Sequence, residues 1–74
     1  MDWIQMLKGK SLKEYLGKYI LEPEIETLFE TGYDTGIAFL QLTKEKLEKT
    51  EGLKKMRDGH KDAILGLIDG LFIS

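Results

Sequence analysis

Positive charge gathers at one point of the chain, just before and inside its last predicted helix. The basic residues of this segment, which we call the basic surface, are Lys54, Lys55, Arg57, His60 and Lys61. The N-terminus of a helix presents unpaired N–H groups and a partial positive charge, so cations beside it add to an anion-binding surface. The pattern predicts binding to an acidic group, either carboxylates on a protein or a phosphate.

Acidic residues gather upstream of this segment. Between Glu22 and Leu42 there is no Lys or Arg, and the acidic residues are Glu22, Glu24, Glu26, Glu30 and Asp34. The predicted acidic surface consists of Glu30, Asp34 and Glu45. Complementary charges steer two surfaces together and set their register, which predicts charge-complementary binding. Plain solubility is the alternative, because an isolated surface ion pair contributes only about 0–1 kcal/mol.

The sequence contains few residues that are suited to catalysis or metal binding. His60 is the only histidine, there is no cysteine, and the two serines are a predicted helix cap and the last residue. A hydrolytic triad needs a nucleophile, a base and an oxyanion site together, and a structural zinc site needs several Cys or His ligands. We expect Glu24, Glu26 and Glu30 to face water on one helix rather than to bind a metal. The sequence therefore predicts no catalytic residue, metal, cofactor or small-molecule substrate.

The length of 74 residues suits one small domain, which buries only about 60% of its unfolded surface. Without cysteine no disulfide can stabilise it, so its stability has to come from apolar packing, as in a compact helical bundle. No apolar run reaches the roughly 20 residues of a membrane span, so we predict no membrane insertion. The N-terminus lacks the pattern of a signal peptide, and we expect a cytoplasmic location with the nucleus as the alternative.

Glycines and the single proline divide the chain into short segments. Residues 1–8 predict one helical turn that ends at Gly9. Ser11 and Glu14 have the spacing of a capping box, which predicts a helix starting at Ser11. Pro23 suits the first turn of the next helix, where its missing N–H costs nothing. Aromatic residues are expected in the core: Trp3 folded back on it, with Tyr15, Tyr19 and Phe29.

The second half of the chain predicts three more segments. Residues 37–42 are apolar in a pattern that fits either helix or strand, and Thr43 is the predicted N-cap of a helix over 44–49. Asp58 is the predicted N-cap of the last and longest helix. The apolar stripe of that helix consists of Ala63, Ile64, Leu67, Ile68, Leu71 and Phe72.

Two glycines interrupt the last helix, Gly66 and Gly70. Each costs about 1 kcal/mol relative to alanine in a helix, which predicts that they allow another helix to approach closely. Almost no segment alternates apolar and polar residues as a half-buried strand does. The prediction is an all-α domain of five short helices, the last being the longest.

The order of these segments resembles the sterile alpha motif (SAM) domain family. Leu12-x-x-Tyr15-Leu16 is similar to the family's V-x-x-W-L, with tyrosine in place of tryptophan. The other matching pieces are Leu21, Phe29-x-x-Gly32-Tyr33-Asp34, Phe39-Leu40-x-Leu42-Thr43-x-x-x-Leu47, Gly52-Leu53, Gly59-His60-Lys61 and Ile64-Leu65. The chain departs from the family pattern by an extra residue near Pro23, by Lys46 near a usually acidic place, and by extra residues within 54–58.

The resemblance implies a compact five-helix SAM-like bundle over residues 11–74, with residues 1–10 as an N-terminal extension packed on it. It also implies a non-enzymatic protein–protein interaction module. Many SAM domains associate head to tail, with an acidic mid-domain surface against a basic surface at the start of the last helix. The implied partner is another SAM domain or a second copy of this chain. Leu53 and Met56 are the apolar residues expected at the contact, if they are exposed.

RNA is the alternative partner, because some SAM domains bind RNA hairpins through the same region. The basic surface would then hold phosphates, with Lys10 and Lys13 beside it. The formal net charge of −2 and the acidic surface argue against a dedicated nucleic-acid binder. Protein association is therefore the favoured prediction.

Overall fold

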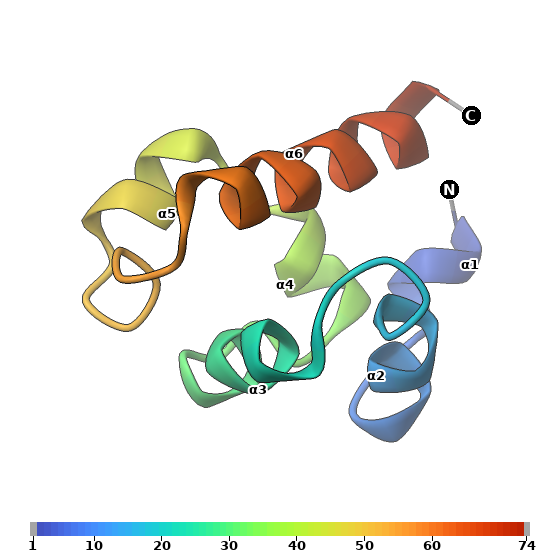
Figure 1. The fold of residues 1–74 in the computed structure, drawn as a ribbon. Helices are drawn as coiled ribbons and strands as arrows, with labels where there is room; N and C mark the ends of the chain where they lie inside the picture. The colour runs from blue at the N-terminus through green and yellow to red at the C-terminus, as the bar shows by residue number, and fades with distance from the viewer. Residues whose placement is uncertain (1, 74) are drawn as a thin grey trace.

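Six α-helices make up the computed structural model, which describes residues 2–73 and holds no strand within that range (Figure 1). They are α1 (Asp2–Gln5), α2 (Lys10–Leu16), α3 (Glu22–Glu30), α4 (Gly36–Leu40), α5 (Lys44–Lys49) and α6 (Asp58–Ile73). The predicted all-α class is confirmed, and the last helix is the longest described. The structure has one helix more than the five predicted, because the N-terminal turn is itself a short helix, α1.

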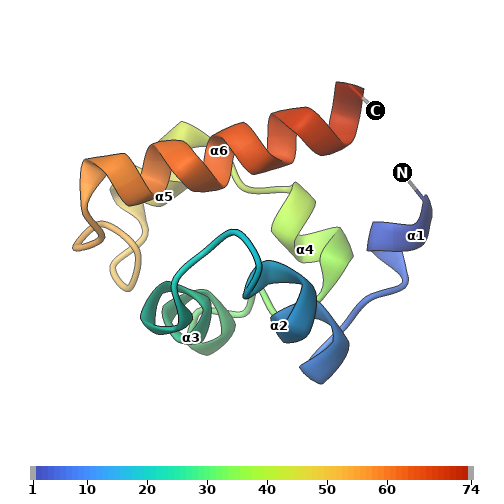
Figure 2. The ribbon, with the colours of Figure 1, turned by 45° about the vertical axis from the view of Figure 1, so that its right-hand side comes forward.

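The helices enclose one core in a body of 29 × 24 × 18 Å. α6 runs across one side, α2 and α3 lie on the opposite side, and α4 lies between them (Figures 1 and 2). The two ends of the chain lie at the same end of the molecule, and the segment before α6 lies at the other.

Every helix contributes at least one side chain to the apolar core, and three loop residues join it. Burial of this surface is the main favourable term in folding a chain without disulfides. The core consists of Ile4, Leu12, Leu16, Ile20, Ile25, Leu28, Phe39, Leu40, Leu42, Leu47, Leu53, Ile64, Ile68 and Leu71. The predicted stripe of α6 is correct in its centre, whereas Ala63 and Phe72 at its two ends are exposed.

The N-terminal segment is bonded to the turn before α4. Gly36 donates its N–H to the Leu7 carbonyl at 2.8 Å, and Gly9 donates to the Asp34 carbonyl at 2.9 Å. Gly36 lies so close to α1 that a Cβ atom there would collide with the Ile4 carbonyl. This close approach places Ile4 in the core.

A row of three aromatic rings links α1 to α2. Trp3 packs edge-on against Tyr15 with ring centroids 5.0 Å apart, and Tyr15 packs against Tyr19 at 5.4 Å. Burial, and secondarily the neighbouring Tyr19, raises the pKa of Tyr15 above its ordinary 10.0. Trp3 and Tyr19 remain 49% and 59% exposed, which corrects their prediction as core residues.

The start of α2 differs from the prediction. The left-handed φ of 54° at Gly9 turns the chain early, so the helix begins at Lys10 and no side chain caps it. Ser11 therefore lies inside the first turn, where its hydroxyl donates to the Lys8 carbonyl at 2.8 Å instead of forming a capping box with Glu14.

Threonines cap the two central helices. Thr35 Oγ1 accepts the Ala38 N–H at 3.1 Å and starts α4, which settles the helix-or-strand ambiguity of residues 37–42. Thr43 Oγ1 accepts the Lys46 N–H at 3.2 Å and starts α5 as predicted.

Two other helix starts were predicted from single residues. Pro23 occupies the first turn of α3 as predicted. The carbonyl of Arg57 accepts the first N–H bonds of α6, from His60 and Lys61. Asp58 is thus the first residue of that helix rather than its cap.

Gly66 and Gly70 do not face another helix, so the prediction of a close approach there is wrong. A Cβ atom at either position would meet nothing within 4 Å, and both residues are exposed. The stripe that packs on the core lies at Ile64, Ile68 and Leu71, which turns both glycines toward solvent.

Substituting Gly36 by alanine is expected to lower the free energy of unfolding by about 1–3 kcal/mol, because α1 or α4 must move away from the added methyl group. Urea unfolding followed by circular dichroism measures the change. Unchanged stability in Gly36→Ala would contradict the close approach of α1 and α4.

Substituting Gly66 and Gly70 by alanine is expected to do the opposite. Each change removes backbone entropy from the unfolded chain and adds about 0.5–1 kcal/mol of stability at an open helix position. The double variant should melt at a higher temperature than the parent. A lower melting temperature would mean that these positions contact another part of the molecule.

Candidate interaction surface

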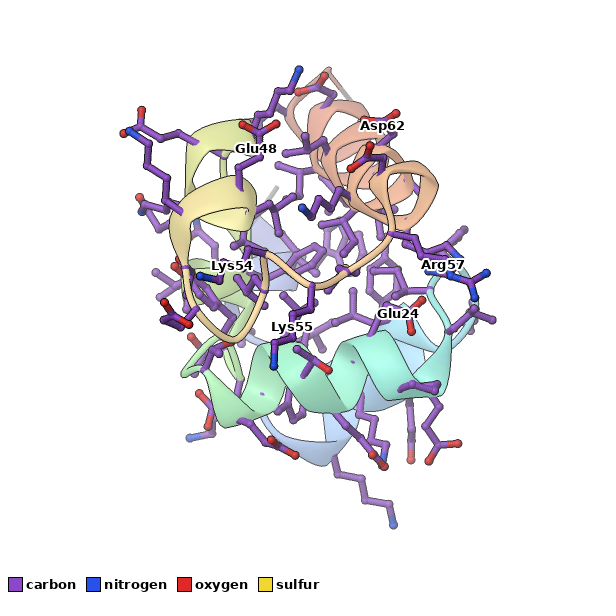
Figure 3. All side chains as sticks on the ribbon, turned by 60° about the vertical axis from the view of Figure 1, so that its left-hand side comes forward. Glu24, Glu48, Lys54, Lys55, Arg57 and Asp62 are labelled. Atoms are coloured by element: carbon purple, nitrogen blue, oxygen red, sulfur yellow. The ribbon has the colours of Figure 1, made fainter. Side chains whose placement is uncertain are left out.

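The acidic helix α3 lies along the basic segment before α6 (Figure 3). At the end of α3, Gly52 is so close to Thr31 that a Cβ atom on the glycine would collide with the threonine methyl group. At the start of α3, the Glu24 carboxylate pairs with the His60 imidazole of α6. The charge asymmetry of the sequence is therefore partly cancelled in space, because acidic and basic segments are neighbours.

Glu24 was expected to face water and is instead 8% exposed. Its Oε1 atom is buried and contacts His60 Nδ1. Glu24, Leu28 and Thr31 are spaced i, i+4 and i+7, so they share the side of α3 that meets the segment before α6. Glu24 precedes the apolar Leu28 by four residues, which places both on one side of a helix. This spacing was the sequence signal for the burial of Glu24.

Two of the five residues of the basic surface have acidic partners. Lys54 Nζ lies 2.9 Å from Glu51 Oε1 on the same loop, and His60 pairs with Glu24. The Lys54 ammonium therefore shares its charge with Glu51, and one nitrogen of the His60 ring is occupied by Glu24.

Lys61 has a structural role. It is only 9% exposed, and its Nζ donates to the backbone carbonyl of Lys54 at 3.1 Å. A small hollow beside it is also lined by the carboxylates of Glu48, Asp58 and Asp62. Lys61 therefore fastens the loop to α6 rather than extending toward a partner, which corrects its assignment as an accessible binding residue.

Lys55 and Arg57 are the accessible cations of the basic surface. Both are exposed, and neither forms an ion pair within the described part of the chain. In Figure 3, Lys54 and Arg57 extend to opposite sides of the segment, with Lys55 over α3 between them. The basic surface therefore has two accessible, unpaired cations, whereas the sequence predicts five accessible basic residues.

An open groove of about 530 Å³ lies beside these two cations. Its apolar lining includes Leu21, which is 58% exposed, and the half-buried Met56. Leu53 is fully buried in the core, so its predicted place in a contact is wrong. Leu21 lies on the link between α2 and α3. The sequence did not predict its place at the groove, because that link is distant from the basic segment along the chain.

The three residues of the predicted acidic surface lie on different elements and are all exposed. Glu30 is the last residue of α3, and Asp34 lies on the turn before α4. Glu45 lies in the first turn of α5, where its Oε1 is 3.3 Å from Lys49 Nζ. Of these three carboxylates, Glu30 and Asp34 form no ion pair with a cation of the described chain.

Within residues 2–73, no group of three or more His, Asp or Glu residues could hold a metal ion. No helix in that range is long and apolar enough to cross a membrane. The Ser11 hydroxyl is bonded to the backbone of Lys8, and the His60 imidazole is occupied by Glu24.

Substituting Lys61 by methionine is expected to lower the free energy of unfolding by about 1–2 kcal/mol, because the loop carbonyl of Lys54 loses a charged hydrogen-bond donor. Lys55→Met is the matched control and should change stability by less than about 0.5 kcal/mol. Equal effects in urea unfolding would mean that Lys61 does not fasten the loop.

Comparison of the chain with protein-family models, with curated proteins and with solved structures gives no match.

Proposed function

We propose that this chain is a SAM-like helical bundle that acts as a non-enzymatic protein–protein interaction module. The order of α2 to α6 supports the proposal, because buried residues of the resembling pieces lie on successive helices. Leu12 and Leu16 lie on α2, Phe39 and Leu40 on α4, and Leu47 on α5, and all five are buried.

The observation that carries the proposed binding is the pair Lys55 and Arg57 beside an apolar groove. Two unpaired cations next to exposed Leu21 and half-buried Met56 suit a partner that presents carboxylates around an apolar side chain. Charges would steer the encounter, and burial of the apolar pair would hold the complex.

Glu30 and Asp34 are the proposed complement on a second copy or on a related domain. A contact between two different surfaces of one chain is heterologous and can continue into open oligomers. A small interface of this kind is expected to bind with micromolar affinity, which corresponds to about −8 kcal/mol.

Sedimentation velocity over a concentration series, in low and then high salt, tests the proposal. The parent should grow in mass with concentration and revert toward the monomer in high salt, because exposed charges are screened. Lys55→Glu with Arg57→Glu should abolish association. The control Lys10→Glu with Lys46→Glu makes the same change in net charge elsewhere and should leave association intact.

Mixing two charge-reversed variants tests the pairing of the surfaces. Lys55→Glu/Arg57→Glu and Glu30→Lys/Asp34→Lys should each remain monomeric, and their mixture should form a 1:1 complex through the intact surfaces. A parent that stays monomeric at every concentration would exclude self-association. Salt-dependent binding of an RNA hairpin, lost in Lys55→Glu/Arg57→Glu, would support the phosphate-binding alternative instead.

A further inference from the structure

The contact between Glu24 and His60 joins the two sides of the groove beside Arg57. Glu24 lies in the first turn of α3 and His60 in the first turn of α6, and both side chains line that groove. No other ion pair or side-chain hydrogen bond of the described residues joins α3 to residues 50–61. The polar link across the groove therefore depends on this one pair.

The two members of the pair differ in their access to water. The Glu24 side chain is 10% exposed, and its buried Oε1 atom contacts His60 Nδ1. The His60 side chain is 38% exposed, so the ring can exchange a proton with solvent. A buried carboxylate without a balancing charge is costly, which makes the free energy of this contact sensitive to the charge of the ring.

The backbone around His60 is fixed, so the ring is held at the carboxylate. The His60 N–H donates to the Arg57 carbonyl at 3.0 Å. The next residue, Lys61, donates its Nζ to the Lys54 carbonyl at 3.1 Å. These bonds anchor the first turn of α6, and the ring faces Glu24 from a defined position.

The other charged groups that face the pair are cations. Lys55 and Arg57 line the same groove, on either side of Glu24 in Figure 3, and the remaining lining side chains are uncharged. Three further charged residues at the start of α6 line a separate hollow beside α5: Asp58, Lys61 and Asp62. Glu24 is therefore the carboxylate that faces His60 in the groove. Neither of the two cations titrates in the pH range of histidine.

We infer that the Glu24–His60 pair is a pH-sensitive link that holds α3 to the start of α6 in mildly acidic solution and weakens as the pH rises. Histidine ordinarily loses its proton near about pH 6.5, and glutamate ordinarily gains one near about pH 4.3. Between these values both groups are charged, and the imidazolium balances the buried carboxylate.

Loss of the proton weakens the pair even though one hydrogen bond can persist. A neutral imidazole can present an N–H at Nδ1, but the carboxylate of Glu24 then has no balancing charge from the ring. The stability that the pair contributes is thus present below about pH 6.5 and is lost as the pH rises above it. It is also lost below about pH 4.3, where the carboxylate gains a proton.

The pair adds a pH dependence to the proposed association, and this consequence rests on that proposed function. Protonation of His60 adds a positive charge to a lining that already includes Lys55 and Arg57, and it strengthens the link across the groove. Both changes favour a partner that presents carboxylates. Association is therefore expected to be stronger at about pH 6 than at about pH 8.

A double-mutant cycle at two pH values tests the inference. Melting temperatures are measured by circular dichroism for the parent, Glu24→Gln, His60→Gln and the double variant, at low protein concentration. The coupling between the two substitutions should be about 4 °C or more at about pH 5.5, and less than half as large at about pH 8. Glutamine is uncharged and can still form hydrogen bonds, so the cycle measures the effect of charge.

Glu51 and Lys54 provide a matched control, because they form an ion pair on the loop before α6. Neither side chain titrates between about pH 5.5 and pH 8. The coupling between Glu51→Gln and Lys54→Gln should therefore be small and equal at the two pH values.

Two results of the melting cycle would overturn the inference. Equal coupling of Glu24 and His60 at both pH values would mean that the proton on the ring does not control the contact. Absence of coupling at about pH 5.5 would mean that the two side chains do not stabilise each other when both are charged.

Sedimentation velocity at the two pH values tests the consequence for binding separately. The association constant of the parent should fall about threefold or more between about pH 6 and pH 8, and His60→Gln should lose this pH dependence. A parent that associates equally at both values would contradict the regulation. A parent that is monomeric at both would contradict the proposed association, whereas the melting cycle decides the pH-sensitive pair on the monomer.

Discussion

The contact between α3 and the segment before α6 controls the electrostatics of this domain. It depends on two points, the close approach of Gly52 to Thr31 and the pair of Glu24 with His60. Because α3 is the most acidic helix and the segment is the most basic part of the chain, their contact brings opposite charges close together. A charged group that is already paired contributes less to a partner than one that is exposed and free. The cations that remain exposed and unpaired in this part of the described chain are Lys55 and Arg57.

The same packing gives the loop before α6 a defined shape. Leu53 is buried in the core, and Lys61 reaches back from α6 to the Lys54 carbonyl. The residues between these anchors project outward, and Met56 is only partly covered. Exposed cations and an apolar edge on a fastened loop lose less conformational entropy on binding than the same residues on a mobile one. The two anchors thus hold the exposed residues of this loop in place.

The opposite end of the molecule is built differently. α1 is held by the close approach of Gly36 to Ile4 and by the bonds of Gly9 and Gly36 to the neighbouring backbone. This arrangement places Ile4 in the core but leaves Trp3 and Met6 partly or largely uncovered. The structure thus has cations beside a groove at one end and exposed aromatic rings at the other.

The sequence by itself determined the helical class, the starts of α3 and α5 and the centre of the core, because these depend on local chemistry and on apolar spacing within one helix. Thr43 caps the start of α5, and Pro23 lies in the first turn of α3. Ile64 and Ile68 follow the helical period. Only the tertiary structure decided which charges are free. The burial of Glu24, the fastening role of Lys61 and the open setting of Gly66 depend on which element packs opposite. That choice is made by contacts between residues distant in the chain, and periodicity within one segment carries no information about them.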